Sequence, residues 1–461
     1  MYGLNRKLLR TLFAASALGA GPAYAANDAM LELLKVLKDK GTIDEAAYEA
    51  LKSAAQADDE QNTAGQAEVK QAAQTLPKIE TKGKLEIATP DGDFSWRLGG
   101  RVHLDGTFAS DDEGTLNRTA IESKADVRRA RLDLTATAWR TWQFKVQYDF
   151  ADGSDQGINR GLRDAWIKYL HKGSTPGVLT IGHFKEFIGL EEITSSNDIS
   201  FVERSMLSGA FNATNGRRLG VGASVAFADR VTTSLGVFGR EIDNSSDDAV
   251  KLTGRLTVSP IHAADKVVHI GAAGSWITDY DNESFSANPR PEFDASSSAR
   301  LLSTSIADVD KAYRFGGEAA VVWGPFSMQG EYQRIDLSRT ALTTEQDPSF
   351  DGWYLFASWI LTGESRLYKF EDGVFQNPKP AGIVGKGGWG AWEVLARYSN
   401  VDLLDGTIGS GEEDNVTVGL NWYPTPNLKF MANYIRVLDI SGGDFDGAEP
   451  SAVALRAQAY W

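Results

Sequence analysis

Residues 451–461 read SAVALRAQAYW, and most of their apolar side chains fall on one side of an extended chain. Side chains alternate across a β-strand, so every second residue shares a face. One face would carry Val453, Leu455, Ala457, Ala459 and Trp461. The other face would carry Ala454, Arg456, Gln458 and Tyr460. Behind an export signal, a closing strand of this kind predicts an outer-membrane β-barrel.

The same two-residue period recurs through the chain upstream of this strand. In residues 94–108, an apolar face with Trp96 and Leu104 alternates with a polar face that carries Arg101 and His103. Similar alternation occurs in residues 129–138, 142–150, 219–227, 251–258, 415–422 and 428–434. Repetition with one apolar face throughout predicts an all-β, transmembrane antiparallel barrel over residues 83–461, of about sixteen strands with both ends in the periplasm. Residues 84–89 would add an edge strand or hairpin.

The connections between the predicted strands alternate in length. Short turns fall at residues 140–141, 228–230, 324–325 and 424–427. Longer polar segments fall near residues 109–123, 185–214, 277–310, 339–350 and 440–450. Short periplasmic turns and long extracellular loops are the pattern of outer-membrane barrels. Residues 363–388 break it, because they run long on the short side, so an elaborated periplasmic turn is expected there.

The N-terminal residues are organised differently. Residues 1–25 have a basic start, a short apolar run and a small-residue site ending at Ala25, which predicts a signal peptide. Residues 26–61 have helical periodicity, with a stop at Gly41 and a capping box at residues 42–45, so they are expected to form a helical hairpin or coiled-coil segment. Residues 62–82 are expected to be a tether. The helices would be either a solvated hairpin or a device for self-association or peptidoglycan-side anchoring.

Composition narrows the function classes. The chain has 46 Gly, 12 Trp and 14 Tyr, which suit turns and interfacial aromatic girdles. A net charge of −15 argues against nucleic acid as a partner. Five histidines, none in a recognisable Ser-His motif, and no cysteine argue against a hydrolase and against a transition-metal site, so neither cofactor, metal nor catalytic residue is predicted. About 60 residues ahead of the barrel are also too few for the plug of an energised receptor.

The chemistry is expected in the lumen. A sixteen-stranded barrel leaves an aqueous channel, and an inward fold of residues 185–214 would narrow it. Arg129 and Arg131 fall on inferred lumenal faces, where Lys185 or Arg204 could face them from the loop. Either these are ordinary wall charges paired across strands, or they form an anion path that replaces part of an oxyanion's hydration shell. Strict alternation would turn Arg128 toward lipid, which requires a rim position or a bulge.

Several motifs together resemble the phosphate-selective porins of the O/P family. They are RRARL at residues 128–132, WQFKVQYDF at 142–150, RDAW at 163–166, GHFKEFIGLEEITSSNDISFVERS at 182–205, GAWEVLARYSNVDLLDG at 390–406 and GLNWY at 419–423. The resemblance covers residues 94–461. It implies a trimeric, sixteen-stranded outer-membrane porin with an inward third loop and an anion-selective constriction of arginines and lysines.

Carried over by motif, Arg128 and Arg129 would line that constriction, with Asp164 near it and Arg101 contributing. The predicted anion-pathway residues are therefore Arg101, Arg128, Arg129, Arg131, Asp164, Lys185 and Arg204. The loop departs from the family pattern. Phosphate-specific members place lysines around the Thr-Ser-Ser motif, but here residues 194–196 are followed by Asn-Asp and preceded by two glutamates at 191–192. The resemblance therefore leaves the favoured solute open.

The sequence thus predicts a porin for passive diffusion of small anions, with phosphate and polyphosphate among the candidates. The alternative is an envelope tether or adhesin that a barrel anchors, without selective transport. Expected partners are small anionic or polar solutes, outer-membrane lipid, two further copies in a homotrimer, and the barrel-assembly machinery. Loss of Trp461 is expected to impair insertion rather than conductance.

Overall fold

The computed structural model describes residues 23–81, 83–110, 121–151, 161–212, 216–239, 250–278, 284–295, 300–340 and 346–461. The chain divides into two compact units, Met1–Pro77 and Lys78–Trp461. The signal peptide predicted for residues 1–25 lies outside the described residues except for its last three, so it stays a prediction.

The first unit is helical. It contains α2 (Ala23–Asp39) and α3 (Glu45–Thr75), and the Asp44 carboxylate caps α3 by accepting a 2.7 Å hydrogen bond from the Ala47 backbone N–H. The cap is thus Asp44 rather than the predicted Thr42. Residues 62–75 are helical where a tether was expected, because a sequence rich in Ala, Gln and Glu favours helix even without an apolar face. None of the described helices is both long and apolar enough to cross a membrane.

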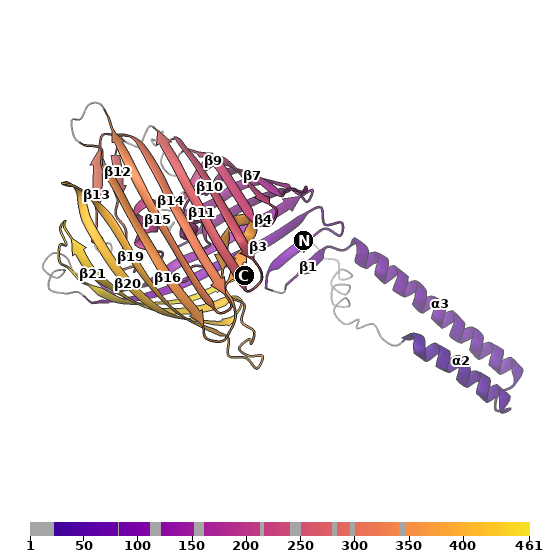
Figure 1. The fold of residues 1–461 in the computed structure, drawn as a ribbon. Coiled ribbons are helices and arrows are strands. Elements are labelled where there is room, and N and C mark those ends of the chain that lie inside the picture. The colour runs from indigo at the N-terminus through magenta and orange to yellow at the C-terminus, as the bar shows by residue number, and fades with distance from the viewer. Residues whose placement is uncertain are drawn as a thin grey trace, which may run out of the picture. The chain divides into compact units, whose positions relative to one another are not determined.

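The second unit is an antiparallel β-barrel (Figure 1). Its wall strands are β3 (Ser95–Ser110), β4 (Lys124–Ala138), β5 (Trp142–Asp149), β6 (Leu162–His171), β7 (Gly177–Lys185), β8 (Arg217–Phe227), β9 (Val231–Phe238), β10 (Val250–His262), β11 (Lys266–Thr278), β14 (Val309–Trp323), β15 (Phe326–Arg339), β16 (Ser349–Ile360), β19 (Ala391–Asp405), β20 (Ile408–Thr425), β21 (Leu428–Ser441) and β22 (Ser451–Tyr460).

Pairing of the last wall strand with the first closes the barrel. β22 pairs with β3 from Ser451 opposite Ser110 to Tyr460 opposite Arg101. The hydrogen-bonded sheet has eighteen strands, and two of them, β1 (Lys78–Glu80) and β2 (Leu85–Ala88), form a hairpin that pairs with the start of β3. The remaining sixteen form the closed wall, as predicted. The predicted extra edge strand at residues 84–89 is β2.

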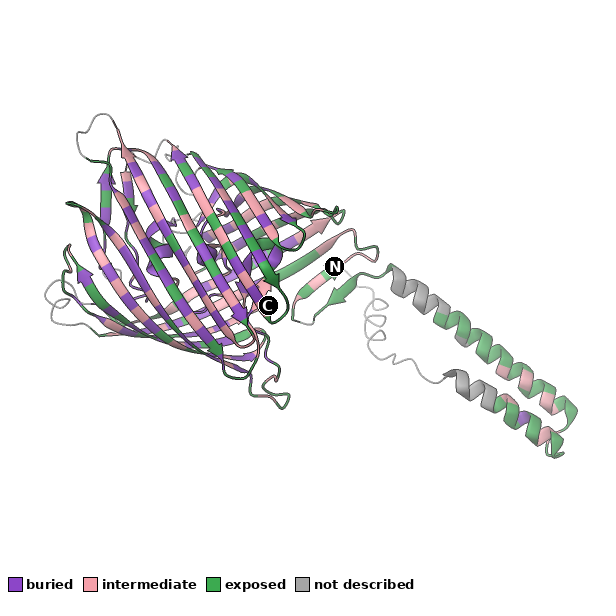
Figure 2. Ribbon diagram, in the orientation of Figure 1, coloured by how far each residue is buried: buried purple, intermediate pink, exposed green. Residues whose placement is uncertain are grey.

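The exposure of wall residues alternates as the sequence predicts, and Figure 2 shows it as bands along the strands. On β3, Leu104 and Phe108 are exposed, whereas His103, Asp105 and Thr107 are buried. The apolar face of the wall is therefore its outer face, and the polar face points into the lumen. An outer apolar face with every backbone group paired is what a lipid bilayer requires of a barrel.

The connections define two ends of the barrel. At the loop end, the strand connections are residues 111–123, 150–161, 186–216, 239–249, 279–308, 340–348, 406–407 and 442–450. At the turn end, they are residues 139–141, 172–176, 228–230, 263–265, 324–325, 361–390 and 426–427. The long segment at 361–390 is the predicted elaborated turn, with β17 (Leu367–Lys369), η2 (Phe370–Asp372) and β18 (Val374–Gln376). The two-residue connection at 406–407 is a short one that the sequence pattern did not indicate.

Three connections supply buried side chains inside the barrel, and we name them here. The inner loop is residues 186–216, with α6 (Leu190–Ile193) and α7 (Met206–Phe211). The cap loop is residues 279–308, with β12 (Ser284–Ala287) and β13 (Thr304–Ala307), and the plug turn is residues 361–390. Inner-loop and cap-loop side chains form one apolar cluster with the wall, which includes Phe201, Leu207, Phe285, Phe293, Leu302 and Ile335.

A glycine on β3 accommodates the final aromatic residue. Gly100 exchanges backbone hydrogen bonds of 3.2 and 3.1 Å with Trp461, and a Cβ on Gly100 would lie 2.2 Å from the indole Cζ2 of Trp461. We expect Gly100→Ala to destabilise the barrel seam by about 1–3 kcal/mol, the usual cost of overpacking. Gly106→Ala is the matched control on the same strand, because its nearest new neighbour is 3.9 Å away. Thermal loss of the folded, heat-modifiable form in detergent measures the effect, and equal transition temperatures would contradict it.

Candidate functional site

The inner loop is bound to the wall opposite its own strands. The Glu331 carboxylate on β15 accepts hydrogen bonds from the backbone N–H groups of Leu190 at 2.6 Å and Glu191 at 2.7 Å. Backbone groups inside a barrel that do not pair with a strand need other partners, since leaving them unpaired costs free energy. The wall therefore supplies side chains that satisfy the loop.

Further wall side chains bind the loop backbone along its length. Lys429 donates to the Ile199 carbonyl at 2.7 Å, Asn421 to the Ser200 carbonyl at 2.8 Å, and Gln458 to the Asn197 carbonyl at 2.8 Å. These donors stand on β20, β21 and β22. The inner loop thus crosses from β7 and β8 to β20–β22, which leaves an open passage on the other side of the lumen, along β4–β9.

Arg397 on β19 is the central fixed charge of this attachment. Its guanidinium pairs with Glu292 of the cap loop at 2.7 Å and with Glu191 of the inner loop at 3.3 Å. It also donates to the Glu203 carbonyl at 3.2 Å and lies 4.3 Å from the ring centroid of Phe201. All of these groups are buried, so one arginine joins the inner loop, the cap loop and the wall.

The plug turn meets the inner loop from the turn end of the barrel. The Asn377 backbone N–H donates to the Asp198 carboxylate at 3.1 Å, and its side-chain amide donates to the Asn197 carbonyl at 2.6 Å. Arg255 on β10 anchors the turn through hydrogen bonds to the carbonyls of Asp372 and Gly373. The two inward segments therefore narrow the lumen from both ends.

The open passage is a cavity of about 1010 Å³. Its lining contains fifteen Lys and Arg residues against seven Asp and Glu residues, although the chain as a whole has 47 basic and 62 acidic residues. Local charge at a constriction governs which ions enter, because field lines are focused between low-dielectric walls. The passage is therefore an electropositive site within an acidic protein.

A β-bulge turns Arg128 into the lumen. On β3 and β4, His103 pairs with Arg129 and Leu104 pairs with Val127, so the register skips Arg128. The extra residue of a bulge redirects its side chain. Arg128 lines the cavity and pairs with Glu203 of the inner loop at 2.9 Å and with Asp294 of the cap loop at 3.4 Å. This resolves the conflict between strict alternation and the family resemblance.

Arg101 and Arg129 lie in the cavity without an ion pair to any carboxylate of the described residues. Arg101 donates to the Ser196 hydroxyl at 2.8 Å, and Arg129 approaches Nδ1 of His103 at 3.4 Å. His103 Nε2 in turn lies 3.2 Å from the Asn197 side-chain oxygen, which suits a neutral ring protonated on Nε2. The Nε atoms of both arginines are buried without a hydrogen-bond partner among the described residues, so the protein does not fully satisfy either guanidinium.

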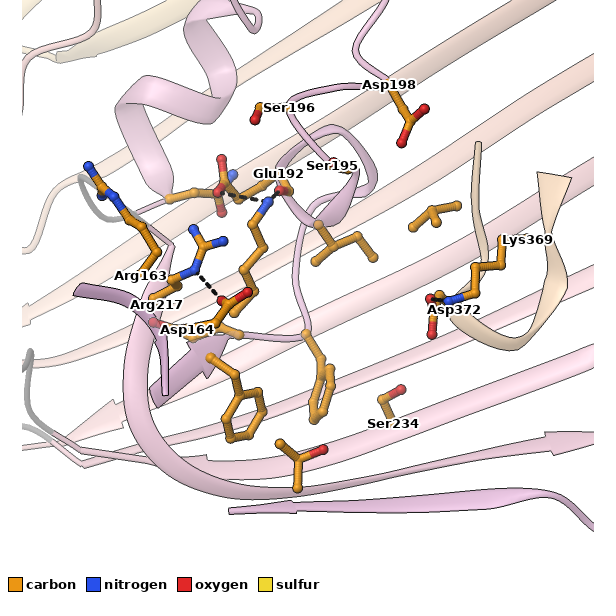
Figure 3. A pocket seen from close by; sticks show the side chains of 18 of the residues that line it. Arg163, Asp164, Glu192, Ser195, Ser196, Asp198, Arg217, Ser234, Lys369 and Asp372 are labelled. Atoms are coloured by element: carbon orange, nitrogen blue, oxygen red, sulfur yellow. Dashed lines mark hydrogen bonds and ion pairs between the residues drawn. The ribbon is translucent and has the colours of Figure 1, made fainter. Parts of the chain in front are cut away.

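Several other cations of this wall are paired with carboxylates, and Figure 3 draws one of these pairs. Arg131 pairs with Asp149 at 2.6 Å. Asp164 pairs with Arg217 at 2.7 Å and with Lys145 at 3.2 Å, and the Arg217–Asp164 contact is drawn as a dashed line. Asp164 thus orients two cations and is not an independent anion-repelling group.

Lys185 and Arg204 bind the backbone of the inner loop. Both line the cavity, but their donors bind inner-loop carbonyls: Lys185 bonds Glu192 and Thr194, and Arg204 bonds Glu191, Glu192 and Thr194. These carbonyls belong to α6 and its C-cap, where a helix end leaves carbonyls without intrahelical partners, and the two cations satisfy them. The sequence allowed either of them to face Arg129 and Arg131 from the loop, and that role stays a prediction.

Two acids of the inner loop, Glu192 and Glu203, stay ionised because of nearby cations. Burial would raise the pKa of the Glu192 carboxyl, but Arg204 and Lys185 lower it below its usual range. Burial likewise opposes ionisation of Glu203, yet Arg128, Arg129 and Arg456 hold its pKa well below the usual value. The loop attachment therefore persists at neutral and mildly acidic pH, and would be lost only as the pH falls through these lowered pKa values.

The sequence predictions missed several cations of the passage. Arg217 lies at the start of β8 and lines the cavity. Lys168 stands on β6 in the same alternating face as Trp166, a signal that was available. Arg290 and Arg300 come from the cap loop, which was taken as an external segment. No cluster of metal-ligating residues occurs within the described ranges.

Comparisons with known proteins agree with this geometry. The profile of the family described as phosphate-selective porin O and P matches residues 97–461. The chain belongs to this family. It is 30% identical to Porin O of Pseudomonas aeruginosa over 402 residues, which cover 80% of this chain and 90% of the relative. This porin is therefore a protein of the Gram-negative outer membrane, and family and fold point to a channel rather than an enzyme.

Solved structures share the fold of this porin. OmpT of Vibrio cholerae matches with a TM-score of 0.52 at 14% identity, over 80% of this chain and 98% of that one. The anion-selective porin of Comamonas acidovorans matches with a TM-score of 0.50 at 13% identity, over 80% of this chain and all of that one. At such identities the likeness concerns the barrel alone.

Proposed function

We propose that this porin allows passive diffusion of small anions through the passage between the inner loop and β4–β9. The observation that carries the proposal is the charge of the lining, fifteen basic against seven acidic residues. Arg101 and Arg129 are the central groups, because both line the cavity and neither has a carboxylate partner among the described residues. An arginine offers planar paired donors that suit phosphate and carboxylate oxygens.

The family and the names of relatives support anions as the solute class. The family, which includes this chain, is described as phosphate-selective, and the Comamonas porin, which shares the fold, is named as anion-selective. Phosphate and polyphosphate are candidate solutes, but the inner loop here has Glu191 and Glu192 before its Thr-Ser-Ser motif. Those acids are bound to Arg397, Arg204 and Lys185, so they leave the passage electropositive without favouring one oxyanion.

Reversal potentials in a salt gradient test the proposal. The full chain, purified from membranes and inserted in a planar bilayer, is expected to conduct and to give a reversal potential of the sign for chloride over potassium. A potential of the opposite sign would contradict anion passage. Absence of open-channel current would favour the alternative of a barrel-anchored tether or adhesin.

We also propose a homotrimer in outer-membrane lipid, inserted by the barrel-assembly machinery, on the basis of family likeness. Chemical cross-linking in isolated membranes is expected to give a species of three copies. A known trimeric porin in the same membranes serves as the positive control. If the reagent cross-links that porin but leaves this one as a single copy, the trimer is contradicted.

A further inference from the structure

The wall formed by β6–β9 is unlike the arginine-rich side of the passage. Its register aligns Leu170, Val178, Ser224 and Ser234 in one row across the four strands. The adjacent row aligns Lys168, Thr180, Gly222 and Gly236. Ser224 and Ser234 bond to each other at 2.8 Å, so their hydroxyls already have a partner. This part of the wall has one cation and few free donors.

An aromatic ring from the inner loop covers the two glycines. A Cβ on Gly222 would lie 2.6 Å from Cε2 of Phe187, and a Cβ on Gly236 would lie 3.1 Å from the same atom. The ring also packs against Phe238 with centroids 5.8 Å apart. Phe187 is partly exposed and lines the cavity. Its ring, packed on the two glycines, therefore presents an apolar surface to the passage.

Lys168 lies between apolar groups on the same strand face. Trp166, Lys168 and Leu170 alternate on β6 and all line the cavity. The Lys168 ammonium lies 4.4 Å from the ring centroid of Trp166 and forms no ion pair with a carboxylate of the described residues. Two acids of the cavity lining are paired with other cations. Asp164 pairs with Arg217 and Lys145, and Asp372 pairs with Lys369 (Figure 3).

We propose that this wall is a subsite for organic anions in which a carboxylate is joined to a flat apolar group. The carboxylate would pair with Lys168, and the apolar group would lie against Trp166, Leu170 and the ring of Phe187. Apolar surface gains free energy when it leaves water, whereas an inorganic oxyanion needs donors on every side and finds only one here. The inference rests on the proposed anion passage and specifies a class of solute for it.

Block of chloride current tests the subsite. The full chain in planar bilayers is titrated with benzoate, acetate and inorganic phosphate at fixed pH. In the wild type, benzoate is expected to reach half block at about a tenfold lower concentration than acetate, because its ring contacts the apolar wall. Trp166→Gln with Leu170→Thr is expected to bring that ratio close to one and to leave phosphate block unchanged. Leu170→Thr alone should give an intermediate ratio.

A second variant tests whether the charge of Lys168 is needed for block by carboxylates. Lys168→Gln is expected to weaken block by both carboxylates together. Lys266→Gln is the matched control, since the Lys266 ammonium lies 4.7 Å from the Trp323 ring outside the cavity, and it should change neither. An anion-selective channel blocked equally by benzoate and acetate would overturn the subsite alone. A cation-selective wild type would instead overturn the proposed function.

Discussion

Replacing Arg397 with methionine is expected to detach the inner loop from the wall. The open-channel current should become larger and should fluctuate more. The variant leaves the carboxylates of Glu191 and Glu292 buried without their cation, where the native contacts are 3.3 and 2.7 Å. Breaking a buried pair by removing one partner costs about 3–5 kcal/mol. A cost of that size raises the population of the detached loop by about a hundredfold or more. The wall should remain closed, because its strand pairing does not depend on this side chain.

Single-channel recording and limited proteolysis measure the effect. Arg397→Met is expected to give larger, noisier steps and faster cleavage within residues 186–212. Arg436→Met is the control, since Arg436 pairs with Glu449 at 2.8 Å at an exposed site, where an ion pair contributes little. A variant at 397 with wild-type steps and protease resistance would show that other contacts alone hold the loop.

The barrel was predictable from the sequence because its determinants are local. Alternation on each strand fixes which side chains meet lipid, and turn length fixes the order of the connections, so the wall, β2 and the long turn at 361–390 followed from pattern alone. For Arg128, which lies at a bulge, two arguments from the sequence conflicted. Alternation placed its side chain toward lipid, and the family resemblance placed it in the lumen. The bulge reconciles the two.

The contents of the barrel were less predictable, because they depend on contacts between residues far apart in sequence. The cap loop was classed as an external polar segment, yet Phe285, Phe293 and Leu302 are buried against the inner loop. Those apolar residues were the available signal. The role of Lys185 and Arg204 carried no such signal, since only the folded loop shows that its carbonyls lie within reach. Several wall charges are therefore paired structural groups, whereas Arg101 and Arg129, which have no carboxylate partner among the described residues, are those for which we propose an anion path.

Neutralising Arg101 and Arg129 together is expected to lower the permeability ratio of anion over cation by about tenfold. At an effective dielectric constant of about 20, a unit charge about 5 Å away contributes about 3 kcal/mol, which neighbouring charges and salt reduce. Arg101→Gln with Arg129→Gln keeps hydrogen-bonding groups beside Ser196 and His103. Neither removed charge has an ion-pair partner among the described residues, and Arg128 and Arg456 still compensate Glu203, so folding stability should fall only slightly.

The control separates local charge from total charge. Arg97→Gln with Arg436→Gln removes the same two charges from exposed positions outside the cavity, and should leave the reversal potential unchanged. If both double variants keep the wild-type potential, selectivity is set by cations other than Arg101 and Arg129. If both shift it equally, net charge governs permeation, and the arrangement of the arginines along β3 and β4 has no special part. Loss of selectivity in the lumenal variant alone is the result expected of a constriction, because fixed charges there act on a nearby ion through a field that low-dielectric walls focus.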